Sequence, residues 1–107
     1  MIREISLALI KLHILYHATR QAVYGLALIQ ELESHGYSLS PGTLYPLLHK
    51  LEKAGWLAAE KRVVNGKARK YYRATETGQA ALLEAQARMR ELLAEMDEGR
   101  IIPEEGE

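Results

Sequence analysis

The chain has 107 residues, of which 48% are hydrophobic, and its formal net charge is zero. This length predicts a single domain with a modest core. The sequence contains no cysteine, which excludes disulfides, cysteine-ligated metals and thiol redox sensing, and suits a reducing cytoplasm. The N-terminus lacks the pattern of a signal peptide, and the apolar run Leu7 to Tyr16 is shorter than the roughly 20 residues that span a bilayer. We therefore expect a cytoplasmic protein without membrane contact.

The first predicted helix covers Ile2 to Ala18, where apolar residues recur at intervals of three and four. They cover more of the helix surface than a small domain can bury alone, which predicts contact with a second subunit. The stretch His17 to Ala22 is expected to connect this helix to the next. His13 and His17 have the i, i+4 spacing of paired metal ligands, but no acid or third histidine lies near them in sequence. We interpret them as polar positions beside the interface and predict no metal site.

Two helical segments follow, Tyr24 to Glu33 and Ser40 to Gly55, with a short turn between them. Ser40 suits the N-cap of the second helix, Pro41 its first turn, and Gly55 the position just past its end. A helix, turn and helix of this size form the unit that places its second helix in the DNA major groove. The pattern therefore predicts DNA reading by the second helix.

This second helix has one apolar face, which predicts inward packing, and one polar face. Tyr45 is expected to point outward, and the alternative is a core tyrosine. Pro46 lies beyond the first turn and predicts a local bend or a loosened first turn. The apolar face consists of Leu44, Leu47, Leu48 and Leu51. The DNA contacts expected from this helix and its approach are Ser38, Ser40, Gly42, Thr43, Tyr45, His49, Lys50 and Lys53.

A β-hairpin is predicted next, because Trp56 to Val64 and Arg69 to Thr75 suit strands and Asn65-Gly66 lies between them. A basic hairpin directly after a helix-turn-helix makes a winged helix. The residues expected to pack onto the helices are Leu57, Val63 and Tyr72. The residues expected to stay solvated and to contact DNA are Lys61, Arg62, Lys67, Arg69 and Lys70. Lysines at a hairpin edge also deter aggregation, but five cations around one turn exceed that need.

The charges of the chain are segregated although their sum is zero. Residues 50–73 carry eight Lys or Arg against two Glu, and residues 74–107 carry three Arg against nine acids. Screening acts over about 8 to 10 Å, so DNA responds to the local patch rather than to the sum. The basic patch coincides with the proposed reading helix and wing.

The last predicted helix runs from Thr75 to Met96 and has an a/d seam of about two heptads. Paired with the first helix of another subunit, it would complete a dimer. The expected interface consists of Ile5, Leu9, Leu12, Tyr16, Leu82, Ala85, Met89, Leu92 and Met96. The expected α+β organisation is a winged helix-turn-helix over 1–75, a dimerisation helix over 76–97 and a flexible acidic tail over 98–107.

Several motifs, in this order, resemble the PadR family of bacterial transcriptional regulators. They are Tyr24-Gly25, the run Ser40 to Leu48 (SPGTLYPLL), Leu51-Glu52 with Gly55, Arg69 to Tyr72 (RKYY) and Thr75 to Gly78 (TETG). The resemblance covers about residues 2–97. One departure is Gly25-Leu26-Ala27, where the family commonly has Gly-Tyr-Glu. The resemblance implies a homodimeric repressor of a DNA operator, released by a small molecule or stress signal. An effector site would lie between the paired helices around Leu9, His13, Met89 and Leu93.

Two other function classes remain as alternatives. An enzyme is disfavoured, because we find no cysteine nucleophile, Gly-rich phosphate loop or paired carboxylates on one predicted face, and we expect no catalytic residues and no cofactor. A winged helix can also serve as a protein-interaction module without DNA binding, which would show no salt-dependent binding to duplex DNA, whereas a DNA-binding protein shows a steep salt dependence.

Overall fold

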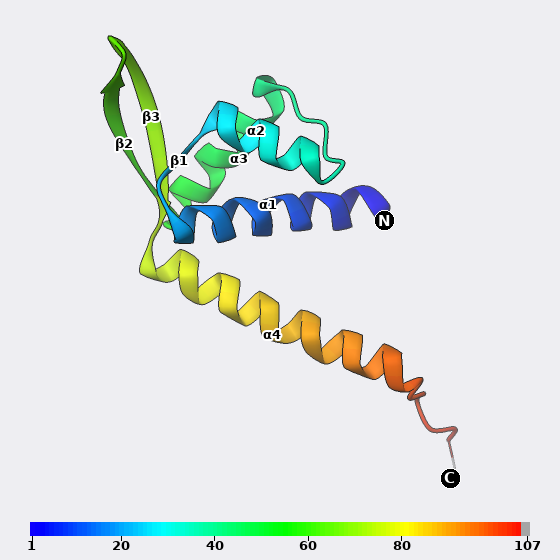
Figure 1. Cartoon of the computed structure of the whole chain (residues 1–107). Helices are drawn as coiled ribbons and strands as arrows, with labels where there is room; N and C mark the ends of the chain where they lie inside the picture. Colours follow the sequence, from blue (N-terminus) through cyan, green and yellow to red (C-terminus); the bar gives the residue numbers. More distant parts are fainter. Residues whose placement is uncertain (106–107) are drawn as a thin grey trace.

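The computed structural model describes residues 1–105, which form four helices and a three-stranded antiparallel sheet of order β1-β3-β2 (Figure 1). This confirms the predicted α+β winged helix with an added C-terminal helix. In chain order the elements are α1 (Ile2–Arg20), β1 (Val23–Tyr24), α2 (Gly25–Ser34), α3 (Pro41–Lys53), β2 (Leu57–Val64), β3 (Lys67–Ala74) and α4 (Glu76–Glu98). The last two residues of the predicted acidic tail, Gly106 and Glu107, lie outside the described residues.

The segment between the first two helices differs from the sequence-based expectation. The first helix continues through Arg20, so His17 to Arg20 are helical and do not form the connection. Leu15 and Ala18, near the end of this helix, are fully buried, and their packing favours a helix that continues to Arg20. The short strand β1, which we did not predict, pairs Val23 with Tyr72 of β3. A strand of two residues is too short to give a periodic signal.

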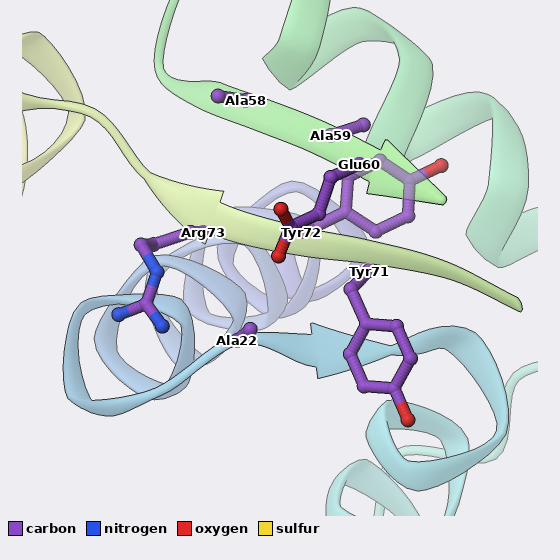
Figure 2. Close-up of a pocket in the computed structure, with 7 residues that line it drawn as sticks. All are labelled: Ala22, Ala58, Ala59, Glu60, Tyr71, Tyr72 and Arg73. Atoms are coloured by element: carbon purple, nitrogen blue, oxygen red, sulfur yellow. The ribbon is translucent and has the colours of Figure 1, made fainter. Parts of the chain in front are cut away.

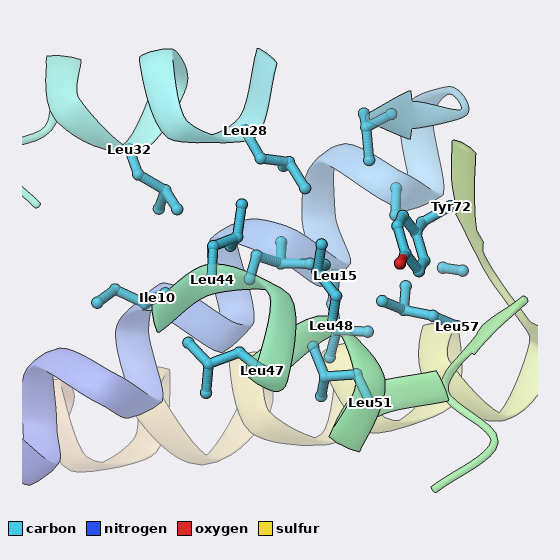
Figure 3. Packing of buried hydrophobic residues seen from close by; sticks show 14 residues of the cluster. Ile10, Leu15, Leu28, Leu32, Leu44, Leu47, Leu48, Leu51, Leu57 and Tyr72 are labelled. Atoms are coloured by element: carbon cyan, nitrogen blue, oxygen red, sulfur yellow. The ribbon is translucent and has the colours of Figure 1, made fainter. Parts of the chain in front are cut away.

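A single core joins the first three helices to the sheet (Figure 3). Because Leu57 and Tyr72 are buried there, two of the three wing predictions are confirmed. Val63 is 76% exposed, and the prediction for this residue was wrong. Side chains alternate along a strand, so Val63 is on the same side of β2 as Leu57 and Lys61. The hairpin extends past the helices toward its turn (Figure 1). The alternation of side chains along the strand is correct, but no helix is present there to cover the side chain.

The last helix, α4, packs against the rest of the molecule near its start, where Leu82 contacts the core, and then diverges from it (Figure 1). Thr75 caps it as predicted: its Oγ1 accepts a hydrogen bond from the Gly78 amide at 3.0 Å and donates one to the Gly55 carbonyl at 2.5 Å. Gly78 is the buried residue of this helix, and a β-carbon there would collide with the Trp56 carbonyl. The helix ends at Glu98, two residues later than predicted, with Gly99 in the left-handed conformation.

None of the helices within residues 1–105 combines the length and the apolar character that crossing a membrane requires.

Candidate nucleic-acid interface

The second helix of the helix-turn-helix, α3, begins and ends where the sequence predicts. The Ser40 carbonyl accepts hydrogen bonds from the amides of Thr43 and Leu44, both at 3.0 Å, so Ser40 is the N-cap residue. Its hydroxyl makes no capping bond to the backbone and lies 3.3 Å from the Thr43 hydroxyl instead. The helix is continuous through Pro46, and Gly55 follows it with φ of 83°.

The apolar face of α3 is buried and its polar face is exposed, as the sequence predicts. The four leucines of the apolar face are buried and pack against α1 and α2 (Figure 3). All eight residues that the sequence assigned to DNA contact on this helix and its approach are exposed, and they are Ser38, Ser40, Gly42, Thr43, Tyr45, His49, Lys50 and Lys53. The helix therefore presents hydroxyls, a phenol, an imidazole and two ammonium groups on one accessible surface.

Tyr45 combines the two alternatives that the sequence left open. Its side chain is 43% exposed, so it is not a core residue. Its ring nevertheless lies against Gly25 at the start of α2, where a β-carbon would be 2.5 Å from the Tyr45 hydroxyl oxygen. Because glycine has no side chain, the ring can approach this closely. Tyr45 thus presents one edge to solvent while its position is fixed by the first helix of the helix-turn-helix.

The wing is the hairpin of β2 and β3, and its turn is the predicted Asn65-Gly66 pair. These residues have φ of 51° and 77°, the left-handed values that a two-residue hairpin turn requires. The register places Lys61 opposite Lys70, and Arg62 opposite Arg69. Like charges that face each other across strands destabilise a hairpin. Binding of an anion to the wing would therefore relieve the repulsion within these two adjoining pairs of cations.

Some of these cations have partners inside the chain. Arg62 forms an ion pair with Glu60 and lies 4.6 Å from the centroid of the Tyr71 ring. Lys70 Nζ lies 3.3 Å from Glu52 Oε1 on α3. Lys61 and Lys67 are exposed and form no ion pair within residues 1–105. These two lysines therefore remain available to an external anion.

Arg69 and Lys70 are only partly exposed, which differs from the expected full solvation near the tip. They lie further down the wing, level with the helices. The Arg69 guanidinium lies 4.5 Å from the centroid of the Tyr24 ring, and Tyr24 in turn packs against Tyr71 at 5.3 Å between centroids. An open hollow of about 220 Å³ lies between α3 and the wing, lined by Tyr24, Gly25, Leu26, Tyr45, Ala68, Arg69 and Lys70.

The other face of the sheet carries a second hollow, beside Tyr71 (Figure 2). Tyr71 and Tyr72 leave β3 on opposite sides, as neighbours on a strand do. The small side chains of Ala22 and Ala58 leave space of about 200 Å³ beside Tyr71 and Arg73. The hollow gives the Tyr71 ring room but contains no grouping of polar side chains typical of a catalytic site.

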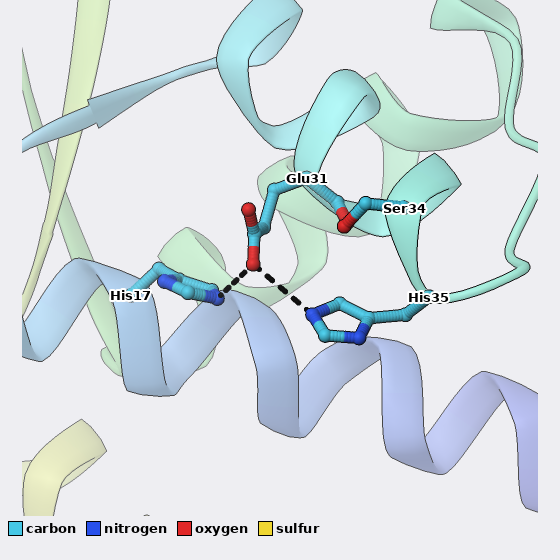
Figure 4. A network of polar contacts seen from close by, with 4 residues as sticks. All are labelled: His17, Glu31, Ser34 and His35. Carbon is cyan, nitrogen blue, oxygen red and sulfur yellow. Dashed lines mark hydrogen bonds and ion pairs between the residues drawn. The ribbon is translucent and has the colours of Figure 1, made fainter.

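Histidines from α1 and from the turn after α2 meet at one acid (Figure 4). Glu31 Oε1 lies 3.2 Å from His17 Nε2 and 3.1 Å from His35 Nε2. The ring of His13 stacks on His35 at 4.6 Å between centroids. The described part of the chain contains no group of three or more such residues arranged to hold a metal ion. The cluster therefore joins α1 to α2 as a polar contact.

The expected dimer surface is largely uncovered in the single chain. Its exposed members are Ile5, Tyr16, Met89, Leu92 and Met96, and its half-buried members are Leu9, Leu12, Leu82 and Ala85. An open groove of about 350 Å³ lies between α1 and α4, lined by Leu9, Leu12, His13, Tyr16, Leu82, Gln86 and Met89. Three of the four residues expected around an effector site line it, and Leu93 does not.

The sequence analysis assigned no role in contacts between elements to three residues: Tyr24, Glu31 and Glu52. Each has a partner from another part of the chain: Arg69 for Tyr24, His17 for Glu31, and Lys70, 18 positions away, for Glu52. The charge of Glu52 within a basic stretch was the available signal, since an isolated acid there suggests a specific partner.

Comparisons with known proteins agree with this geometry. Residues 14–84 match the model of the transcriptional regulator PadR-like family. The transcriptional regulator Rv3488 of Mycobacterium tuberculosis is 53% identical over 94 residues, which cover 88% of each chain. Among solved structures, a PadR family transcriptional regulator from Eggerthella lenta is 35% identical, with a TM-score of 0.78 over 92% of this chain and 87% of its own.

A PadR-like transcription factor from Bacteroides fragilis is 28% identical, with a TM-score of 0.77 over 92% of this chain and 95% of its own. The match to the family and to named regulators supports DNA binding by the winged helix and a role in transcription rather than catalysis. On these grounds the chain belongs to the PadR-like family of transcriptional regulators.

Proposed function

We propose that this regulator is a homodimeric, sequence-specific repressor whose α3 helix enters the major groove of an operator while the wing contacts the flanking backbone. The observation that carries this proposal is that α3 and the wing meet at one hollow. Tyr45 of α3 lines one hollow together with Arg69 and Lys70 of the wing and with Tyr24, Gly25 and Leu26 at the start of α2. A duplex lying on α3 would therefore also meet the wing.

Base recognition is assigned to the exposed residues whose side chains can donate and accept hydrogen bonds, Thr43, Tyr45 and His49. Phosphate contacts are assigned to Ser38, Ser40, Gly42, Lys50 and Lys53, and to the wing residues Lys61, Arg62, Lys67, Arg69 and Lys70. Such contacts fix the register of a protein on the duplex and supply most of its affinity, without reading sequence.

Dimerisation through α1 and α4 is proposed because both helices leave large apolar side chains uncovered. Met89 is 38% exposed and Leu92 is 52% exposed in the single chain, and Met96 follows on the same seam. Two reading helices held by one dimer would address two half-sites of a palindromic operator. The open groove between α1 and α4 is the proposed effector site, so an effector there would change the spacing of the reading helices. Repression would take place in the cytoplasm.

Selection of bound sequences from random duplex DNA tests this function directly. We expect enrichment of a palindromic sequence, and binding to it that weakens steeply as salt rises. A random duplex of equal length is the control for specificity. If no sequence is enriched and binding shows no salt dependence, the alternative of a protein-interaction module would replace the proposal.

A further inference from the structure

We propose that Arg69 and Lys70 are positioning residues that hold the wing against both helices of the helix-turn-helix, with Glu52 and Tyr24 as their partners. Neighbouring residues on a strand point to opposite faces, so one of these cations lies on each face of β3. One contact reaches α3 and the other reaches the start of α2. The inference rests on the proposed DNA binding and assigns a different role to two of its cations.

The contact on one face of the strand joins the wing to α3. Lys70 Nζ lies 3.3 Å from Glu52 Oε1, and both side chains are only a little more than one third exposed, at 38% and 37%. Lys70 also lies 5.4 Å from the centroid of the Tyr72 ring, which is buried in the core. Partial burial lowers the pKa of Lys70, but Glu52 and Tyr72 outweigh this effect, and the pKa lies above its ordinary value. Lys70 therefore remains a cation directed at α3.

The contact on the opposite face joins the wing to α2. The Arg69 guanidinium lies 4.5 Å from the centroid of the Tyr24 ring, within the range of a cation–π interaction. Tyr24 is the residue before α2, and its backbone pairs with Tyr71 of β3. The ring, the strand pairing and the helix start are thus parts of one unit. Arg69 fixes the wing to the same segment whose Gly25 receives Tyr45.

The register explains why these contacts matter to the wing. Arg69 and Lys70 face Arg62 and Lys61 directly, and repulsion between like charges would spread or loosen the hairpin. On β3, Glu52 offsets part of the positive charge of Lys70, and the face of the Tyr24 ring offsets part of that of Arg69. Lys61 and Lys67 can then contact DNA from a wing that is held in one orientation.

The first test uses the sign of a charge change. Removing an acid beside DNA strengthens binding to every duplex if the acid only repels phosphate. If Glu52 positions the wing, Glu52→Gln should instead weaken operator binding by about threefold to tenfold. The pair reversal Glu52→Lys with Lys70→Glu should recover affinity relative to either reversal alone. Glu33→Gln, at an exposed position of α2, is the matched control. Tighter operator binding by Glu52→Gln would overturn the inference.

The second test does not depend on DNA. Because the chain has no cysteine, Val63→Cys on the wing and Glu33→Cys on α2 allow two spin labels to be attached specifically. We expect a narrow distance distribution that broadens with Glu52→Gln, with Arg69→Lys and with Tyr24→Leu. Tyr24→Phe keeps the ring and should keep the distribution narrow. An unchanged distribution in all variants would overturn the inference, whereas broadening in a chain that binds no operator would overturn only the proposed function.

Discussion

The hydroxyl oxygen of Tyr45 occupies the space that a side chain at Gly25 would need. A β-carbon at position 25 would lie 2.5 Å from this oxygen and 2.8 Å from Tyr45 Cζ, closer than such atoms approach in folded proteins. Tyr45 belongs to α3 and Gly25 is the first residue of α2, so the contact fixes the two helices of the helix-turn-helix against each other. The absence of a side chain at one position thereby places a proposed base-reading residue at another.

Gly25→Ala should destabilise the fold by about 1 to 3 kcal/mol, because the tyrosine ring must move. Tyr45→Ala alone should cost about 1 kcal/mol, since the ring is only partly buried. In the double variant the added methyl meets no ring, so the two effects should not add. Urea unfolding of the four proteins measures the coupling. Strictly additive changes in the free energy of unfolding would show that the added methyl group does not clash with the tyrosine ring.

Local chemistry was sufficient to predict the limits of the helix and hairpin that carry the proposed DNA-binding surface. Ser40, Pro41 and Gly55 mark the limits of α3 because capping and left-handed backbone depend on single residues. Asn65-Gly66 defines the turn of the wing for the same reason. The exposed face of α3 followed from helical spacing. These features depend on neighbours in sequence, which a sequence displays directly.

Features that depend on distant partners could not be predicted in this way. Val63 alternates correctly, but its exposure depends on where the helices end beneath the wing. Tyr45 faces outward as spacing implies, and only tertiary packing brings it onto Gly25. The bond between Glu52 and Lys70 joins residues 18 positions apart. A sequence pattern contains no information on which of several nearby cations an acid selects.

Thr75→Ala should lower the free energy of unfolding by about 1 to 2 kcal/mol, because Thr75 both caps α4 and bonds the Gly55 carbonyl. Thr75→Ser keeps the hydroxyl and should retain most of the stability, which makes it the matched control. Thermal or urea unfolding measures the difference. Equal losses in both variants would assign the effect to the methyl group rather than to the hydrogen bonds.

The pKa of His13 predicts a dependence of stability on pH. Burial lowers this pKa below its ordinary 6.5, His35 and His17 lower it further, and Glu31 acts in the opposite direction. As pH falls below 6.5 the unfolded chain therefore takes up a proton at His13 before the folded chain does, and stability decreases until the folded pKa is passed. The glutamine variant His13→Gln removes this contribution.

We expect the wild-type protein to lose stability relative to His13→Gln as the pH falls through and below 6.5, while the difference stays constant at higher pH. Urea unfolding at several pH values provides the comparison. Because carboxylates titrate in both proteins, only the difference between the two curves reports on His13. A constant difference over the whole range would contradict the prediction.

Lys61→Gln and Lys67→Gln should each weaken binding to all duplexes alike and reduce the salt slope by about one unit, if each lysine contacts one phosphate. The ratio of operator to random affinity should not change. Arg90→Gln on α4, far from the wing in sequence and exposed, controls for the loss of one positive charge. Loss of discrimination with an unchanged slope would mean that the wing reads bases.

Met89→Asp with Leu92→Asp should convert a dimer into monomers, because both side chains are exposed in the single chain and lie on one seam of α4. Charges on this seam would have to be desolvated in an interface between α1 and α4 of two subunits. Ala87→Asp with Ala94→Asp adds the same charges on the opposite side of the helix, as the helical spacing requires, and should leave the dimer intact. Sedimentation measures the mass of each variant, and circular dichroism verifies that each remains folded. A folded Met89→Asp, Leu92→Asp variant that sediments as a dimer would place the interface elsewhere. Dissociation of both double variants would show that α4 tolerates acids on neither side.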